Sequence, residues 1–150
     1  MHEEGRYMNT EHILVVEDTN LVRILVRSRL EAAGYQVIGA GTVSEALQAI
    51  KTRMPDLLIL DLSLAAADLA ELTDGFAFLG LLRRNYPEAN PAVIIYSVNH
   101  SPEVEARAKS MGAVAVMDKK GGVPALLTAV RTALDERKSK QPAVPVVSCA

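Results

Sequence analysis

Residues 57–61 read LLILD, a run of four aliphatic residues that ends in an aspartate. Because the run is short and uninterrupted, it is typical of a strand that is buried on both faces of a parallel sheet. Four more short apolar runs occur along the chain, and a segment with helical spacing follows each of the five. The predicted strands are His12–Glu17, Gln36–Ala40, Leu57–Asp61, Val93–Ser97 and Val114–Asp118. This alternation predicts an α/β fold, a doubly wound five-stranded parallel sheet flanked by five helices.

The segments between the predicted strands contain residues that commonly begin and end helices. Thr42, with Glu45 three positions later, forms a capping box. Gly34 and Gly112 follow the first and fourth segments, where a left-handed C-terminal cap is expected. The predicted helices are about 20–33, 43–50, 75–85, 102–111 and 124–140.

Length and composition limit the class of protein. With 150 residues, 49% of them hydrophobic and 23% charged, the chain is long enough for one globular domain with a real core and too short for a second full domain. We place this domain at residues 12–139. A flexible N-terminal extension is predicted at 1–11, and a flexible C-terminal tail at 140–150, where two prolines occur without periodicity.

Charge and apolar content indicate the compartment and the partners. A formal net charge of −2 provides no basic surface for a nucleic-acid backbone or an anionic membrane. Cys149 is the single cysteine, so no internal disulfide can form, and the opening MHEEGRYMN lacks the apolar stretch of a secretory signal. No apolar run approaches the roughly 20 residues that a membrane span needs. We therefore expect a cytoplasmic protein that binds neither a membrane nor, directly, a nucleic acid.

Polar residues stand at the ends of four predicted strands. Glu17 and Asp18 follow the first apolar run, Asp61 the third and Ser97 the fourth, while Lys119 comes after the fifth. The carboxyl ends of parallel strands meet at one edge of a sheet, where ligands bind, so we expect these side chains to converge. Three carboxylates there repel one another, and Mg²⁺ relieves such repulsion. A lysine and a hydroxyl are the partners that a phosphoryl group needs.

Five motifs occur together in a fixed order, namely VVEDTN at 15–20, LLILDLSL at 57–64, Asp-Gly at 74–75, IIYSV at 94–98 and MDKK at 117–120. With this combination the chain resembles the receiver domain of bacterial response regulators over about residues 12–139. The resemblance implies a flavodoxin-like (βα)5 fold and a phosphorylation switch in two-component signalling. It implies a phosphoacceptor with self-catalysed phosphotransfer and dephosphorylation, not a free-standing enzyme.

The resemblance also implies which residues hold the Mg²⁺ cofactor. Asp18 is expected to bind the ion directly and Glu17 through a water molecule. Asp61 and the backbone carbonyl of Ser63 complete the expected protein ligands. All four residues lie at the end of a predicted strand or just after it, at the edge where ligands of such sheets bind.

Three residues carry the phosphoryl chemistry that the resemblance implies. Asp61 is the expected phosphoacceptor, and Ser97 and Lys119 are expected to hold the phosphoryl oxygens. The expected donor is a phosphohistidine on a sensor histidine kinase or a histidine phosphotransfer protein. Since no effector domain follows the last predicted helix, we expect a single-domain regulator that signals to a downstream protein target through a change in protein contacts.

The sequence departs from the family pattern in three places. The pair Asp74–Gly75 lies later than usual because AAADLAELT at 65–73 lengthens the loop after Asp61. Val116 stands where the family usually has an aromatic residue, three positions before the lysine. Lys120 stands where a proline commonly follows that lysine.

Three other interpretations fit parts of the sequence. VIGAGTVSEA at 37–46 follows a strand and opens a helix, as in a dinucleotide-binding domain, although Ser44 occupies the third glycine position. Asp61 also fits the nucleophile of a haloacid dehalogenase-type phosphatase, but such enzymes are expected to carry a second aspartate where Ser63 stands. A phosphorylation-independent docking module, or pseudo-receiver, would keep the fold without the chemistry, and Val116 is compatible with it.

The fifth strand sets the register of two adjacent lysines. We expect three of its side chains in the apolar interior, Val114, Val116 and Met117. The family spacing then implies that Lys119 enters the site and that Lys120 points toward solvent or a partner.

Removal of the tail from Gln141 onward is expected to leave phosphate uptake unchanged, because its prolines and lack of periodicity give it little means of joining the core. Uptake by the full chain and by a chain ending at Lys140 can be compared by intact-mass spectrometry. A truncated chain that no longer takes up phosphate would show that the tail packs near the site.

Overall fold

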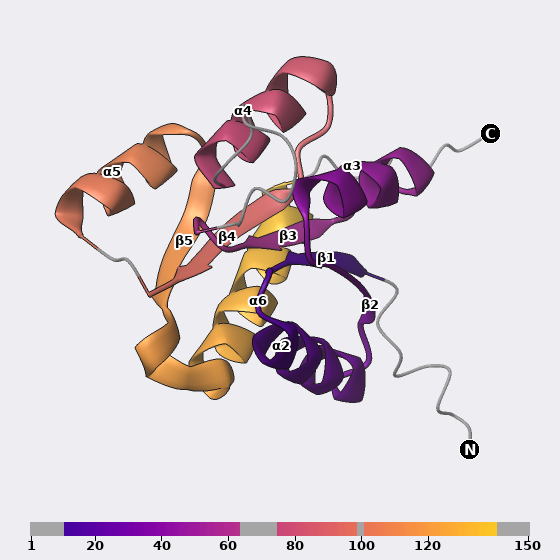
Figure 1. Cartoon of the computed structure of the whole chain (residues 1–150), viewed down its shortest axis with the longest axis vertical. Helices are drawn as coiled ribbons and strands as arrows, with labels where there is room; N and C mark the ends of the chain where they lie inside the picture. Colours follow the sequence, from indigo (N-terminus) through magenta and orange to yellow (C-terminus); the bar gives the residue numbers. More distant parts are fainter. Residues whose placement is uncertain (1–10, 64–74, 99–100, 141–150) are drawn as a thin grey trace.

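The computed structural model shows five parallel strands in one sheet, in the order β2-β1-β3-β4-β5 (Figure 1). It describes residues 11–63, 75–98 and 101–140. The strands are β1 (His12–Val16), β2 (Gln36–Ala40), β3 (Leu57–Leu60), β4 (Ala92–Ser97) and β5 (Ala113–Asp118). This strand order is the flavodoxin-like one, so the predicted fold class is confirmed.

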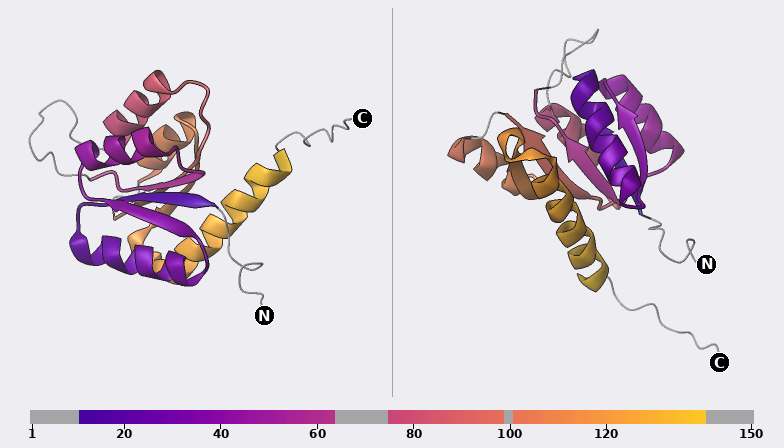
Figure 2. Two further views of the ribbon diagram at one scale, coloured as in Figure 1. Left: turned by 90° about the vertical axis from the view of Figure 1, so that its right-hand side faces the viewer. Right: turned by 90° about the horizontal axis from the view of Figure 1, so that it is seen from below.

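Helices cover both faces of the sheet. The faces are shared between α2 (Asn20–Ala32) with α6 (Gly122–Lys140), and α3 (Val43–Thr52) with α4 (Gly75–Asn85) and α5 (Pro102–Ser110). Figure 2 shows the first pair on one side of the sheet and the other three helices on the opposite side. A short 3-10 helix, η1 (Lys119–Gly121), joins β5 to α6. Each face of the sheet therefore has its own apolar core.

The central strand β3 explains why its sequence is apolar without interruption. Leu58 and Leu60 face the core under α3 and α4, whereas Leu57 and Ile59 face the core under α2 and α6. All four side chains are buried. Full burial of one such side chain stabilises the fold by about 1.5–3 kcal/mol. The chain continues directly from this strand into Asp61.

The edge strand β5 differs from the prediction. Val114 was expected in the interior, but 51% of it is exposed, and Val116 and Met117 are only half buried. The prediction for Val114 is wrong because β5 is hydrogen-bonded to β4 alone, which leaves its outer side without a neighbouring strand. The apolar residues of β5 therefore indicate a preference for the strand conformation more than burial of their side chains.

The helix ends agree with their sequence signals, with one shift. Gly34 and Gly112 have φ of 100° and 96°, the left-handed conformation expected at both positions. The last helix was expected to begin near Pro124, but it begins at Gly122. Pro124 is tolerated as its third residue because the first N–H groups of a helix have no partner within the helix.

Charged residues tie the end of α6 to the amino ends of the strands. Asp56 accepts a hydrogen bond from the His12 amide at 2.8 Å, and Arg137 reaches the same carboxylate at 3.3 Å. Lys138 pairs with Glu11 at 2.6 Å. Glu11, the last residue of the predicted N-terminal extension, is buried. The rest of that extension, and the tail after Lys140, lie outside the described residues.

No helix in the described ranges combines the length and the apolarity needed to cross a membrane.

Replacement of Thr42 with alanine is expected to lower the free energy of unfolding by about 1 kcal/mol. The reason is that the Thr42 hydroxyl accepts the Glu45 amide at 3.0 Å and so caps α3. The matched control is Thr52→Ala at the other end of α3, where the hydroxyl only donates to the Gln48 carbonyl. Urea denaturation measures both variants, and equal losses would contradict the capping role.

Candidate functional site

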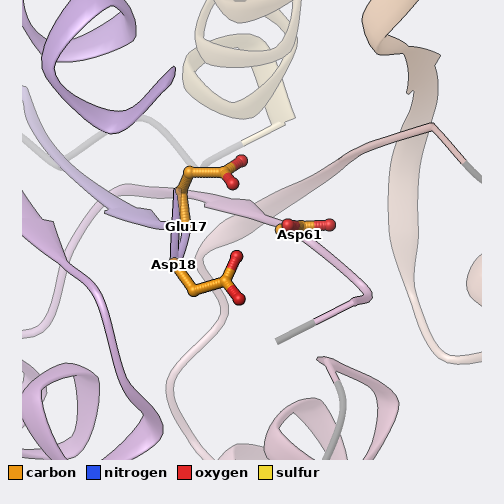
Figure 3. A group of neighbouring side chains, drawn as sticks. All are labelled: Glu17, Asp18 and Asp61. Carbon is orange, nitrogen blue, oxygen red and sulfur yellow. The ribbon is translucent and has the colours of Figure 1, made fainter. Parts of the chain in front are cut away.

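Three carboxylates meet at the carboxyl edge of the sheet. Glu17 and Asp18 follow β1, and Asp61 follows the adjacent strand β3. The Asp61 amide donates to the Val16 carbonyl at 3.0 Å, so the sheet pairing itself brings the acids side by side. One carboxylate oxygen from each acid lies within 4.8 Å of the others. Figure 3 shows the three side chains emerging from these two neighbouring strand ends.

Two of these carboxylates are deeply buried. Glu17 is 2% exposed and Asp61 3% exposed, whereas Asp18 is half buried. A buried charge is unfavourable unless it is paired and hydrogen-bonded. Among the described residues, the buried polar or charged side chains are Glu11, Glu17, Asp61 and Ser97, and three of these four belong to the predicted site.

Lys119 is the charge partner of both buried acids. Its ammonium group lies 2.8 Å from Glu17 Oε1 and 3.2 Å from Asp61 Oδ2. The lysine side chain is only 15% exposed. One ammonium group thus stands between two carboxylates, and with Asp18 beside them the cluster carries more negative than positive charge.

The protonation behaviour of the cluster follows from burial and from this imbalance. Burial raises the pKa of Glu17 above its usual value; the hydrogen bond from Lys119 opposes the rise, and the charge of Asp61 adds to it. Burial alone would lower the pKa of Lys119, but the hydrogen bond to Glu17 and the charge of Asp61 outweigh it, so the pKa rises. The lysine therefore stays protonated, while the charge on Glu17 remains unfavourable.

The backbone around Asp61 is held closely on both sides. The Ser63 amide donates to Asp61 Oδ1 at 3.0 Å. On the other side, a side chain at Gly75 would place its Cβ 2.7 Å from the Asp61 carbonyl oxygen. Glycine therefore allows α4 to begin against the site. Asp74 and the 65–73 loop lie outside the described residues.

Ser97 and Lys120 are the remaining residues that the sequence places at or beside the site. Ser97 is buried at the carboxyl end of β4, the strand next to β3. Lys120 is exposed, and its amide donates to the Asp118 carboxylate at 2.8 Å. The structure thus directs Lys119, and not Lys120, into the acid cluster.

Two site neighbours were missed by the sequence reasoning. The buried ring of Tyr96 lies 5.9 Å from the Lys119 ammonium group, within the range of a cation–π contact. Arg23 donates to the Glu17 carbonyl at 2.8 Å. The position of Arg23 one turn into the helix after the acid pair was the available signal. No sequence signal marked Tyr96, because it is one residue of an apolar run.

The glycine-rich segment at 37–46 does not form a dinucleotide site. The Gly41 amide, which a phosphate would need, donates to Glu45 Oε1 at 2.7 Å. Any side chain at Gly41 would place its Cβ 2.7 Å from Arg23 Nη1. These glycines accommodate an arginine of the same chain, and the dinucleotide interpretation is therefore wrong.

Comparisons with known proteins agree with this geometry. Residues 13–131 match the response regulator receiver domain family. KDP operon transcriptional regulatory protein KdpE of Escherichia coli is 32% identical over 136 residues, which cover 91% of this chain and 56% of that protein. Sporulation initiation phosphotransferase F of Bacillus subtilis is 28% identical over 124 residues, 83% of this chain and 94% of that protein. The solved receiver domain of NtrX from Brucella abortus has a TM-score of 0.72 at 30% identity, covering 82% of this chain and 98% of that one.

Replacement of Lys119 with alanine is expected to lower the free energy of unfolding in metal-free buffer by about 1.5–3 kcal/mol at neutral pH. The variant leaves Glu17 and Asp61 buried and repelling each other. Because the folded-state pKa of Glu17 is raised, this penalty is present above that pKa and shrinks as acidification protonates the carboxylate.

The matched control for this measurement is Lys120→Ala, whose side chain is exposed. It should change the stability by no more than about 0.5 kcal/mol. Denaturant titration at several pH values checks both variants. A larger loss for Lys120→Ala would show that the structure assigns the wrong lysine to the cluster.

Proposed function

The chain belongs to the response regulator receiver domain family, and from that premise we propose that it accepts a phosphoryl group on Asp61 beside a bound Mg²⁺ ion. Phosphorylation and Mg²⁺ binding are general to receiver domains, which act in two-component systems with histidine kinases and phosphotransfer proteins. The observation that carries the proposal is the pairing of two buried carboxylates with a single lysine at the carboxyl edge of the sheet.

The acid cluster fits Mg²⁺ in charge and in size. Direct ligands of one octahedral Mg²⁺ ion lie at most about 4 Å from one another. The three carboxylate oxygens lie within 4.8 Å of one another, close to that limit. In the proposed set Asp18 and Asp61 bind the ion directly and Glu17 binds it through water. The Ser63 carbonyl is the remaining proposed ligand. When bound, the ion neutralises negative charge on the carboxylates and on the incoming phosphoryl oxygens.

Asp61 is the proposed nucleophile. A carboxylate oxygen attacks phosphorus, the new O–P bond forms as the donor's N–P bond breaks, and the imidazole leaves with the bonding electrons and then takes up a proton. The Ser63 amide and the Lys119 ammonium group already contact one Asp61 oxygen each, so they hold the carboxylate in one orientation. Lys119 can then turn to the phosphoryl group, and Ser97 is proposed to donate a hydrogen bond to it.

The proposed partners follow from this chemistry. The donor is a phosphohistidine on a sensor histidine kinase or a histidine phosphotransfer protein, and the output is a changed contact with a downstream protein in the cytoplasm. We propose a phosphoacceptor that is not a free-standing enzyme. The single-domain form is supported by sporulation initiation phosphotransferase F, of which the matched region covers 94%. KdpE gives no such support, because the match covers only 56% of that transcriptional regulatory protein.

One observation favours a second candidate, a docking module that works without phosphorylation. Val116 is half buried at the position where the family usually has an aromatic residue, so the usual aromatic readout of phosphorylation has no counterpart there. The acid cluster with Lys119 favours the phosphoacceptor, and the same experiment separates the two candidates.

Incubation with acetyl phosphate and Mg²⁺ is expected to add one phosphoryl group, as measured by intact-mass spectrometry. The gain should disappear without Mg²⁺ and in Asp61→Asn, because both the ion and the nucleophile are needed. The matched control is Asp135→Asn, which removes an exposed aspartate of α6 and should leave the gain unchanged. If wild type and Asp61→Asn gain the same mass, Asp61 is not the acceptor, and if neither gains any, the docking module is favoured.

A further inference from the structure

Arg23 connects α2 to the loop that bears two of the proposed metal ligands. Its Nη1 donates to the Glu17 carbonyl oxygen at 2.8 Å, and its Nη2 donates to the Asn20 side chain. The Glu17 carbonyl belongs to the peptide group that joins Glu17 to Asp18. The guanidinium group therefore holds the peptide plane that the two acidic residues share.

Other hydrogen bonds hold the rest of this loop in place. The Thr19 amide donates to Glu17 Oε2 at 3.2 Å, and the Arg23 amide donates to the Thr19 carbonyl at 2.9 Å. The Glu17 amide is bound to the Ala40 carbonyl at 2.9 Å. Arg23 Nη1 adds the bond to the carbonyl on the other side of the Glu17 residue.

Two glycines at the end of β2 provide the space for the Arg23 side chain. A Cβ at Gly39 would lie 3.1 Å from Arg23 Cγ, and a Cβ at Gly41 would lie 2.7 Å from Arg23 Nη1. Among the described residues, the glycines with positive φ are Gly34, Gly112 and Gly122. Backbone conformation therefore does not require glycine at 39 or 41. The close approach of the Arg23 side chain does.

We propose that Arg23 is a positioning residue for Mg²⁺ binding, which it supports by fixing the Glu17–Asp18 peptide, and that Gly39 and Gly41 are present to seat it. The inference rests on the proposed function. A guanidinium charge this close to the acids repels a cation, so loss of the charge alone would strengthen Mg²⁺ binding. If Mg²⁺ binding weakens when Arg23 is removed, the cause is therefore the lost positioning of the Glu17–Asp18 peptide.

The test is calorimetric titration of the full chain with Mg²⁺. Arg23→Gln is expected to weaken binding by about tenfold, the lower end of what loss of a residue supporting a metal ligand costs. Gly41→Ala keeps the positive charge but displaces the guanidinium group, which is the flexible end of its side chain, and should weaken binding to a similar extent. The matched control, Arg27→Gln, removes an exposed arginine that pairs with Glu31 on the same helix and should bind Mg²⁺ like wild type.

The double variant Arg23→Gln/Gly41→Ala distinguishes a shared cause from two separate ones. If the glycine acts through the arginine, the double variant binds Mg²⁺ no more weakly than Arg23→Gln alone. Additive losses would overturn the pairing of glycine with arginine. A lower melting temperature of Arg23→Gln with an unchanged Mg²⁺ affinity would overturn the positioning role and leave the proposed function intact. Failure of wild type to bind Mg²⁺ would instead overturn the proposed function, and the inference with it.

Discussion

Two carboxylates buried side by side are the constraint on which this structure depends. Glu17 and Asp61 end adjacent parallel strands, so each stands where the sheet stops and neither can turn fully into water. Such an arrangement is strongly destabilised unless a cation lies between the acids or one of them is protonated. In this chain the cation is Lys119, delivered from the edge strand β5. The fold therefore has to bring the ends of three strands to one point, and the order β2-β1-β3-β4-β5 places β1 and β3 together at the centre.

The same charge imbalance connects stability to chemistry. The protein could have matched the two buried acids with two cations, and the fold would have been less strained electrostatically. One lysine leaves negative charge uncompensated. Burial is the main cause of the raised pKa of Glu17, and the charge of Asp61 adds to it. The two proposed ligands, a divalent ion and a phosphoryl group, would complement this charge arrangement, since the ion favours the acids and the lysine favours the phosphoryl oxygens. Under the proposed function, the uncompensated charge destabilises the protein alone and favours binding of the ion.

The sequence predicted those parts of the fold that short-range patterns determine. The apolar runs located the strands, Thr42 located the start of α3, and Gly34 marked the end of α2. It also placed the three acids at one edge, because parallel strands leave no other choice. Patterns within a single element could not show that Val114 faces outward, since this depends on which strand lies at the edge. Tyr96 was missed for a similar reason, because its contact with Lys119 joins two elements. Arg23 lies only six residues after Glu17, but the helical pattern does not show that its side chain turns back to the Glu17 carbonyl.

Helix α6 is connected to the rest of the fold at both of its ends. Its 19 residues span about 28 Å. Near its end, Arg137 and Lys138 bind Asp56 and Glu11 at the opposite edge of the sheet from the acids, and its start follows directly on the three residues of η1. Because these ion pairs hold the end of α6, we expect a displacement of Lys119 to be absorbed mainly in η1, the short link to which this lysine belongs. Gly121 ends that link and Gly122 begins α6, and an added Cβ at Gly121 would meet no atom within 4 Å. We therefore expect this link to deform more readily than α6, so that motion at the site is either taken up beside the lysine or passed along the whole length of the helix.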